Sequence, residues 1–191
     1  MARLISISGN IGAGKTTLIN MIKEAIPGCH VMPERLHLWN HDNILARYYS
    51  NKKKYAEEMQ QRILDDYSDA FNNIPETGTF VMERCHLDVV MIFCAIGHSN
   101  GEVSSKAMAD FEKQASSFRK PDTLIYLNTD ANTCIDRIDK RGRNGEDMIS
   151  SEYILQLDAA HKNMYGSLSA NGYNCKIINN NNFESVAGCL A

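Results

Sequence analysis

The sequence has no excess of basic residues. Its 191 residues include 20 Lys and Arg against 23 Asp and Glu, which gives a formal net charge of −3. Proteins that coat nucleic acid are normally basic, so we expect no nucleic-acid partner. No apolar run approaches the roughly 18 residues that a membrane span needs, so we expect no membrane partner either. No signal or transit peptide precedes the first expected strand, which predicts a cytoplasmic protein.

The sequence also lacks the cysteine and histidine patterns of stapled or zinc-binding domains. None of its six cysteines forms a Cys-x-x-Cys pair. Because disulfide frameworks belong to short secreted chains, we expect small buried thiols instead. His37 and His41 have helical metal spacing, but a closed zinc site needs four ligands, and no second pair stands near them. Ordinary globular composition predicts one domain over residues 1–191.

What the sequence does have is a regular alternation of strands and helices. Strands are expected at 4–8, 30–32, 79–82, 123–127 and 175–178. Helices are expected at 16–25, 44–72 with a break near Ser50-Asn51, 88–96, 104–118, 130–140, 151–168, and briefly from Glu184. Five apolar strands separated by helices predict an α/β fold with a five-stranded parallel sheet, whose ligands bind beyond the carboxyl ends of the strands. The segment 88–96 is apolar nearly all round, which suits either a core helix or a subunit interface.

The strongest motif lies between the first strand and the first helix. Residues 9–16, Gly-Asn-Ile-Gly-Ala-Gly-Lys-Thr, match the P-loop pattern G-x-x-x-x-G-K-[ST]. In such a loop backbone N–H groups surround phosphates, Lys15 reaches the β and γ phosphates, and Thr16 offers a hydroxyl to Mg²⁺. A purely structural glycine loop is the weaker alternative. The expected ATP-binding residues are Gly9, Asn10, Gly12, Ala13, Gly14, Lys15, Thr16 and Thr17.

Acidic and basic residues follow the second and third expected strands. Glu34 stands past the second strand, where a carboxylate can take a proton from a hydroxyl group, although a solvated loop acid fits as well. Glu83 and Arg84 end the third strand. We expect Glu83 to help hold Mg²⁺, and Arg84 to orient Glu34 and stabilise the acceptor oxygen. A surface ion pair is the alternative for Glu83 and Arg84.

Three arginines mark a further cationic site. Arg137 and Arg141 share a helix face and repel each other, so an anion held between them would turn this repulsion into a clamp. Phosphoryl transfer needs cations where charge spreads over the γ-phosphoryl oxygens. Arg143 follows in a glycine-containing loop, about 141–150, which we expect to close as a lid. A solvated basic helix end is the alternative.

Together these motifs resemble those of the deoxyribonucleoside kinases, the group of the deoxycytidine, deoxyguanosine, mitochondrial thymidine and insect broad-specificity enzymes. The resemblance extends from about Arg3 to Phe183. Glu34…Trp39 resembles the family's E-P-x-x-x-W stretch, residues 82–85 its E-R-S motif, and residues 141–146 its lid.

The resemblance implies a role for each matching residue. Glu34 would be the general base on the sugar 5′-hydroxyl, while Tyr49 and Glu146 hold the 3′-hydroxyl. Gln60 would make paired hydrogen bonds to a base on which Phe93 stacks. Asn182 and Phe183 would cradle the adenine of ATP. The implied catalytic residues are Glu34, Arg84, Lys15, Arg141 and Arg143. The implied substrate-binding residues are Glu34, Trp39, Tyr49, Met59, Gln60, Tyr67, Arg84, Val89, Phe93 and Glu146.

Departures from the family pattern bear on the substrate. Arg35 replaces a proline, Cys85 replaces a serine and weakens a local hydrogen bond, and Met59 stands where a second aromatic often covers the base. Tyr67 and Val89 replace the Arg and Asp of the deoxycytidine and deoxyguanosine kinases. An uncharged pocket partly filled by a tyrosine is closer to the thymidine-type members, so a pyrimidine deoxynucleoside is expected.

The expected reaction is ATP-dependent, Mg²⁺-assisted phosphorylation of the 5′-hydroxyl of a 2′-deoxyribonucleoside in nucleotide salvage. The resemblance also implies a homodimer and feedback inhibition by a deoxynucleoside triphosphate. One alternative is a thymidylate-type nucleoside monophosphate kinase, but Glu34 would repel the acceptor's own phosphate. Another is a regulatory P-loop switch, but residues 51–54 lack the Asp of an Asn-Lys-x-Asp element.

Overall fold

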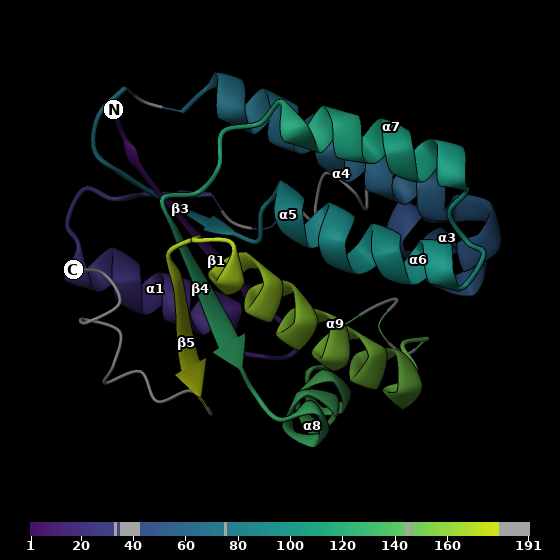
Figure 1. Cartoon of the computed structure of the whole chain (residues 1–191). Helices are drawn as coiled ribbons and strands as arrows, with labels where there is room; N and C mark the ends of the chain where they lie inside the picture. Colours follow the sequence, from purple (N-terminus) through teal and green to yellow (C-terminus); the bar gives the residue numbers. More distant parts are fainter. Residues whose placement is uncertain (33, 35–42, 75, 144–145, 147, 180–191) are drawn as a thin grey trace.

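The structure is a computed structural model that describes residues 1–32, 34, 43–74, 76–143, 146 and 148–179. Its strands form one five-stranded sheet, ordered β2-β3-β1-β4-β5 (Figure 1), in which every pairing is parallel. The strands are β1 (Arg3–Gly9), β2 (His30–Met32), β3 (Thr79–Glu83), β4 (Thr123–Asn128) and β5 (Cys175–Asn179). The predicted five-stranded parallel sheet is confirmed.

Strand β1 occupies the centre of the sheet. After Arg3 its side chains are buried, as expected for a parallel strand covered on both faces. Ile7 pairs with Glu83 of β3, and Gly9 pairs with Leu127 of β4. The register therefore brings the carboxyl ends of the three central strands to one edge of the sheet, where the P-loop begins.

Helices cover both faces of this sheet. They are α1 (Lys15–Ala25), α3 (Ile44–Ser50), α4 (Lys52–Asn72), α5 (His86–Asp88), the π-helix η1 (Val89–Cys94), α6 (Ala95–Ser99), α7 (Ser105–Ser116), α8 (Ala131–Arg141) and α9 (Ser151–Ala170). The connection from β1 to β2 runs in the opposite direction from that between β4 and β5. Because such crossovers are right-handed, α1 and α9 lie on opposite faces, and Figure 1 shows α1 behind the sheet and α9 in front.

The predicted break near Ser50-Asn51 is present, because α3 ends at Ser50 and the Asn51 side chain caps α4 by accepting a hydrogen bond from the backbone of Lys54. The apolar segment 88–96 packs into the core: Val89, Ile92 and other side chains of η1 are buried, and η1 packs against α4, α7 and α9. A subunit interface on its partly buried side stays a prediction. The short helix expected from Glu184 lies outside the described residues.

The expectation of buried thiols is confirmed for Cys85, Cys94 and Cys134. It is wrong for Cys29 and Cys175, which are only partly buried. These two lie where β2 and β5 begin, at the edges of the sheet, where fewer elements cover a side chain. The remaining cysteine and the pair His37 and His41 lie outside the described residues. Within the part of the chain that the structure describes, no helix combines the length and apolarity needed to cross a membrane.

Candidate active site

The P-loop connects the end of β1 to the start of α1. Gly12 has a φ of +80°, and a Cβ atom there would lie 2.6 Å from the backbone oxygen of Cys134, so the close approach of α8 requires glycine. Gly14, the N-cap residue of α1, has no side chain that could cap the helix, and the first turn of α1 holds no acidic residue. The positive end of α1 is thus left for an anion, as the motif predicts.

Lys15 lies buried beneath this loop. Its Nζ donates to the backbone oxygens of Gly9, at 3.2 Å, and Asn10, at 2.9 Å, and lies 3.8 Å from Oε1 of Glu83. Burial, with a smaller contribution from the positive charge of Arg84, lowers the pKa of Lys15 to about 8, and the Glu83 carboxylate opposes both effects. Lys15 is therefore a desolvated cation that a phosphate group would stabilise.

Thr16 and Glu83 meet beside Lys15. The Thr16 hydroxyl donates to Oε2 of Glu83 at 3.1 Å. A hydroxyl and a carboxylate are the hard oxygen donors that Mg²⁺ prefers, so the expected pair fits this ion. The described residues contain no group of three or more His, Cys, Asp or Glu that could hold a metal alone. Phosphate oxygens and water would have to complete the coordination, as is usual for Mg²⁺.

Arg84 lies buried behind the loop and holds Glu34. Its Nη1 is 2.5 Å from Oε1 of Glu34, and its Nη2 donates to the backbone oxygen of Gly9 at 3.2 Å. Burial disfavours the charge, but the carboxylates of Glu34, Glu83 and Asp88 outweigh it and raise the pKa of the guanidinium. The predicted orientation of Glu34 by Arg84 is thus present, with Glu34 at the edge of the pocket.

The backbone at Arg84 is strained. Its φ is +62°, a region that non-glycine residues rarely adopt. Strain of this kind persists where the surroundings hold the residue, and here the Arg84 backbone N–H donates to Ile7 at 2.8 Å. The turn thus directs the guanidinium from the end of β3 across the end of β1.

Asp88, whose role was not predicted from the sequence, caps the helix that follows this turn. Its carboxylate accepts from the backbone N–H of Cys85 at 3.0 Å and from the Ser8 hydroxyl. Burial raises the pKa of the fully buried Asp88. The Cys85 thiol lies 3.6 Å from the same carboxylate, a weak contact as expected for sulfur in place of oxygen. The spacing of Cys85 and Asp88 at a helix start, as in a capping box, was the available signal.

The lid arginines are paired with an acid of the lid itself. Arg141 donates from Nε and Nη2, one edge of its guanidinium, to the buried Glu146 carboxylate at 2.7–3.0 Å, and Arg143 lies 3.3 Å from Glu146. Arg137 instead donates to the P-loop carbonyls of Gly12 and Ala13 at 3.2 and 3.3 Å. The three arginines line the same cavity, but Arg137 and Arg141 have different partners here.

Helix faces form the opposite side of the pocket. Residues that recur every three or four positions along α3, α4 and η1 point into it, and we call this the apolar end: Leu45, Tyr48, Tyr49, Met59, Gln60, Ile63, Tyr67, Val89 and Phe93. Gln60 is only 2% exposed. Its Oε1 has no hydrogen-bond partner within the described residues. Since buried acceptors are almost always satisfied, this amide calls for a donor from a ligand.

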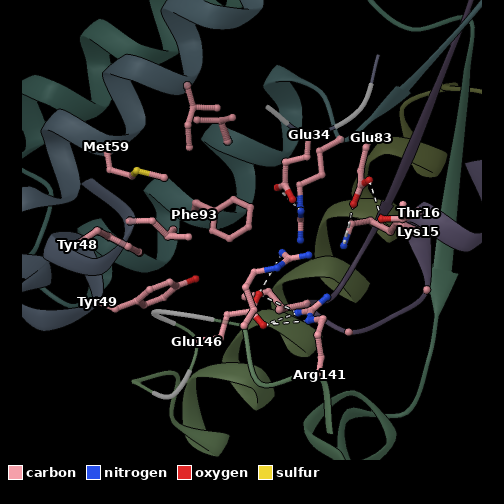
Figure 2. A pocket seen from close by; sticks show the side chains of 18 of the residues that line it. Lys15, Thr16, Glu34, Tyr48, Tyr49, Met59, Glu83, Phe93, Arg141 and Glu146 are labelled. Carbon is pink, nitrogen blue, oxygen red and sulfur yellow. Dashed lines mark hydrogen bonds and ion pairs between the residues drawn. The ribbon is translucent and has the colours of Figure 1, made fainter. Parts of the chain in front are cut away.

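One cavity of about 600 Å³ joins the apolar end to a charged end (Figure 2). The charged end is defined by Lys15, Thr16, Glu34, Glu83, Arg84, Arg137, Arg141, Arg143 and Glu146. Figure 2 shows the labelled aromatic side chains and Met59 on one side, Glu34 and Glu83 on the other, and Arg141 with Glu146 below them. A long ligand with an aromatic end and an anionic end matches this distribution.

The cavity brings most of the predicted residues together. It is lined by Gly12, Gly14, Lys15, Thr16, Thr17, Glu34, Tyr49, Met59, Gln60, Tyr67, Glu83, Arg84, Val89, Phe93, Arg137, Arg141, Arg143 and Glu146. Gly9, Asn10 and Ala13 do not line it, although their carbonyls bind Lys15, Arg84 and Arg137. Trp39, Asn182, Phe183 and Arg35 lie outside the described residues. Four further residues line the cavity without having been predicted: Ile11, Leu45, Tyr48 and Ile63. The last three follow the helical spacing of predicted residues.

Comparisons with known proteins agree with this geometry. The family model "Deoxynucleoside kinase" matches residues 5–187. A probable deoxycytidine kinase of fowlpox virus is 30% identical over 83% of this chain and 69% of its own length. A thymidine kinase of Ictalurid herpesvirus 1 is 27% identical over 79% of this chain and 69% of its own. A deoxyguanosine kinase of Dictyostelium discoideum is 26% identical over 97% of this chain and 66% of its own.

The fold has solved counterparts too. A structure of deoxyadenosine kinase from M. mycoides with bound dCTP superposes with a TM-score of 0.81, at 23% identity, and covers 97% of each chain. This likeness concerns the fold. The match of the family model over nearly the whole sequence goes further: the chain belongs to the deoxynucleoside kinase family.

Proposed function

We propose that this deoxynucleoside kinase transfers the γ-phosphoryl group of ATP to the 5′-hydroxyl of a 2′-deoxyribonucleoside, with a preference for pyrimidines of the thymidine type. One observation carries the proposal. In a single cavity, the Glu34 carboxylate is held by the buried Arg84 between the P-loop and the apolar end. A proton acceptor therefore lies between a cradle for phosphates and a pocket for a base.

In the proposed reaction Glu34 accepts the proton of the 5′-hydroxyl as this oxygen attacks the γ-phosphorus. Arg84 keeps Glu34 in place and, together with Lys15, offers positive charge beside the reacting atoms. Arg137, Arg141 and Arg143 act on the transferring group when the lid closes, which also keeps water from replacing the acceptor. Mg²⁺, when bound by Thr16 and Glu83 with the phosphates, supplies further positive charge on the phosphate oxygens.

The apolar end suits a nucleoside. One amide provides both a donor and an acceptor, so Gln60 can pair with a base edge, and Phe93 offers a ring face for stacking. Figure 2 shows the Tyr49 hydroxyl pointing into the pocket above Glu146. Both are placed for the sugar 3′-hydroxyl, provided that Glu146 exchanges part of its pairing with Arg141 for the sugar.

The base preference rests on Tyr67 and its neighbours. Tyr67 and Val89 line the cavity with no charged pair between them, and both are buried. Asp88, which precedes Val89, accepts hydrogen bonds from Ser8 and Cys85 and does not line the cavity. A tyrosine ring in this position occupies the volume that the larger purine would need. The names of the relatives include deoxycytidine, thymidine and deoxyguanosine kinases, so this pocket alone supports the preference.

Replacing Glu34 tests the mechanism. We expect Glu34→Gln to lower kcat by about 10²–10⁴-fold, because the proton acceptor is lost, while thymidine still binds. The assay uses Mg-ATP with thymidine, deoxycytidine, the purine deoxynucleosides and thymidylate, and calorimetry measures binding. Glu24→Gln on the exposed face of α1 is the matched control. An unchanged kcat removes Glu34 from the reaction, and faster turnover of thymidylate than thymidine favours a monophosphate kinase.

Further features stay predictions from the sequence. These are the homodimer, the feedback inhibition by a deoxynucleoside triphosphate, the cytoplasmic location, the role of Asn182 and Phe183 at the adenine, and the single domain over residues 1–191.

A further inference from the structure

Lys52 lies where α3 and α4 meet, at the edge of the apolar end. Its Nζ lies 3.1 Å from the ring centroid of Tyr153, 5.7 Å from that of Tyr48 and 5.9 Å from that of Tyr49. Among the described residues no carboxylate forms an ion pair with this ammonium group. Burial lowers the pKa of Lys52, opposed by the charge of Glu102. The three tyrosine rings therefore provide the nearest stabilisation of this half-buried cation.

The same rings connect the pocket to the lid. The hydroxyls of Tyr48 and Tyr153 are hydrogen-bonded at 3.1 Å, and the rings of Tyr48 and Tyr49 lie 5.0 Å apart. Tyr153 stands in the first turn of α9, where its backbone N–H donates to the Ser150 side chain at 3.2 Å. The lid runs directly into this turn. Lys52 thus contacts rings from both the helix that supplies Tyr49 and the helix that follows the lid.

We propose that Lys52 is a positioning residue for the phosphoryl acceptor. Its ammonium group holds the Tyr48, Tyr49 and Tyr153 rings together and so fixes the Tyr49 hydroxyl at the sugar 3′-hydroxyl. The proposal rests on the proposed function, because it assumes that Tyr49 contacts the sugar. It adds a residue that does not line the cavity and acts only through a neighbour that does.

The test compares a 2′-deoxynucleoside with its 2′,3′-dideoxy analogue. Lys52→Met removes the charge at similar size, and we expect it to lower kcat/KM for the deoxynucleoside about fivefold. The analogue lacks the 3′-hydroxyl, so its kcat/KM should change little. Lys52→Arg keeps a cation over the rings and should restore most of the loss. Lys53→Met, on the exposed side of the same helix turn, is the control and should behave as the parent enzyme.

A double mutant separates positioning from stability. In a Tyr49→Phe background, Lys52→Met should have no further effect on the preference for the 3′-hydroxyl. Thermal melting accompanies each variant, and Lys52→Gln serves as a second uncharged replacement should the methionine variant melt early. Equal losses on both substrates indicate a structural role and overturn the proposal, as does no loss at all.

The controls also separate this inference from the proposed reaction. If Tyr49→Phe leaves the preference for the 3′-hydroxyl unchanged, the contact between Tyr49 and the sugar is wrong, and the role of Lys52 is wrong with it. The phosphoryl transfer itself is judged independently by Glu34→Gln.

Discussion

The charged end and the apolar end of the cavity are built in different ways. At the charged end, single side chains come from the start of a helix, the ends of strands and the lid, such as Lys15 at the start of α1, Arg84 after β3 and Glu146 in the lid. At the apolar end, three helices each contribute one face, and the contributing residues stand three or four positions apart. The first construction depends on backbone conformation, and the second depends on how helices pack.

The two ends also differ in what a ligand must displace. The cations of the charged end already have partners: Lys15 bonds to loop carbonyls, Arg84 to Glu34, and Arg141 to Glu146. A phosphate group must therefore exchange with existing contacts, which makes binding there sensitive to charge. The Gln60 oxygen has no partner within the described residues, so a base would satisfy it without displacing a protein group. Binding at the apolar end should depend on fit more than on charge.

The largest effect on ligand binding expected from altering one end alone comes from Gly12→Ala. The new Cβ would meet the Cys134 carbonyl at 2.6 Å, and φ at +80° disfavours alanine, so the loop must move away from α8. We expect ADP affinity to fall by about 10²-fold or more, because the backbone N–H groups of the loop no longer point at the phosphates. Thymidine affinity should be nearly unchanged. Calorimetry with each ligand measures this.

Gly166→Ala, in α9 with open space around its Cβ position, is the matched control and should bind both ligands normally. Equal loss of thymidine binding in Gly12→Ala would contradict the independence of the two ends.

A smaller effect is expected from Gln60→Leu, which alters the apolar end alone. Loss of the amide leaves a donor and an acceptor of the base unpaired in a dry site, so kcat/KM for thymidine should fall about 30-fold to 100-fold. ADP affinity should not change. Gln61→Leu is the control, because the Gln61 amide bonds to Asp65 and Gln114 outside the cavity. A larger loss of kcat/KM for Gln61→Leu than for Gln60→Leu would contradict the assignment of base recognition to Gln60.

The difference in construction also explains what could be predicted from the sequence. The P-loop, the parallel sheet that supports it and the position of Glu34 and Arg84 at strand ends follow from local patterns, whereas the order of the strands was not predicted. Met59, Gln60, Tyr67 and Phe93 were identified through the family resemblance, whereas their neighbours Leu45 and Ile63 were not. A helical pattern shows which residues share a face but not which face lines a cavity.

Two features depend on contacts that sequence patterns do not encode. The positive φ of Arg84 results from its backbone bond to Ile7 and from the buried Asp88 that caps the next helix. The pairing of Glu146 with Arg141 results from the folding of the lid onto itself. Both involve charged residues whose partners are brought close by the tertiary structure and not by their spacing in the sequence.

The smallest expected effect is a pH dependence of ATP binding at the charged end. The pKa of Lys15 is lowered to about 8, so in the free enzyme this cation loses its proton as pH rises above that value. A bound triphosphate favours the charged form, so the affinity for ATP is full well below the pKa of about 8 and declines as pH rises through it. At pH 9 we expect kcat/KM for ATP to be about tenfold lower than at pH 7, while kcat at saturating ATP changes less.

Steady-state kinetics from pH 7 to about 9.5 measure both quantities, with thymidine saturating throughout. Lys15→Arg keeps its charge over this range, so the decline should vanish in that variant whatever its absolute rate. If the parent and Lys15→Arg show the same decline, another group titrates. Thymidine affinity measured without ATP should change less over the same range, which assigns most of the pH sensitivity to the charged end.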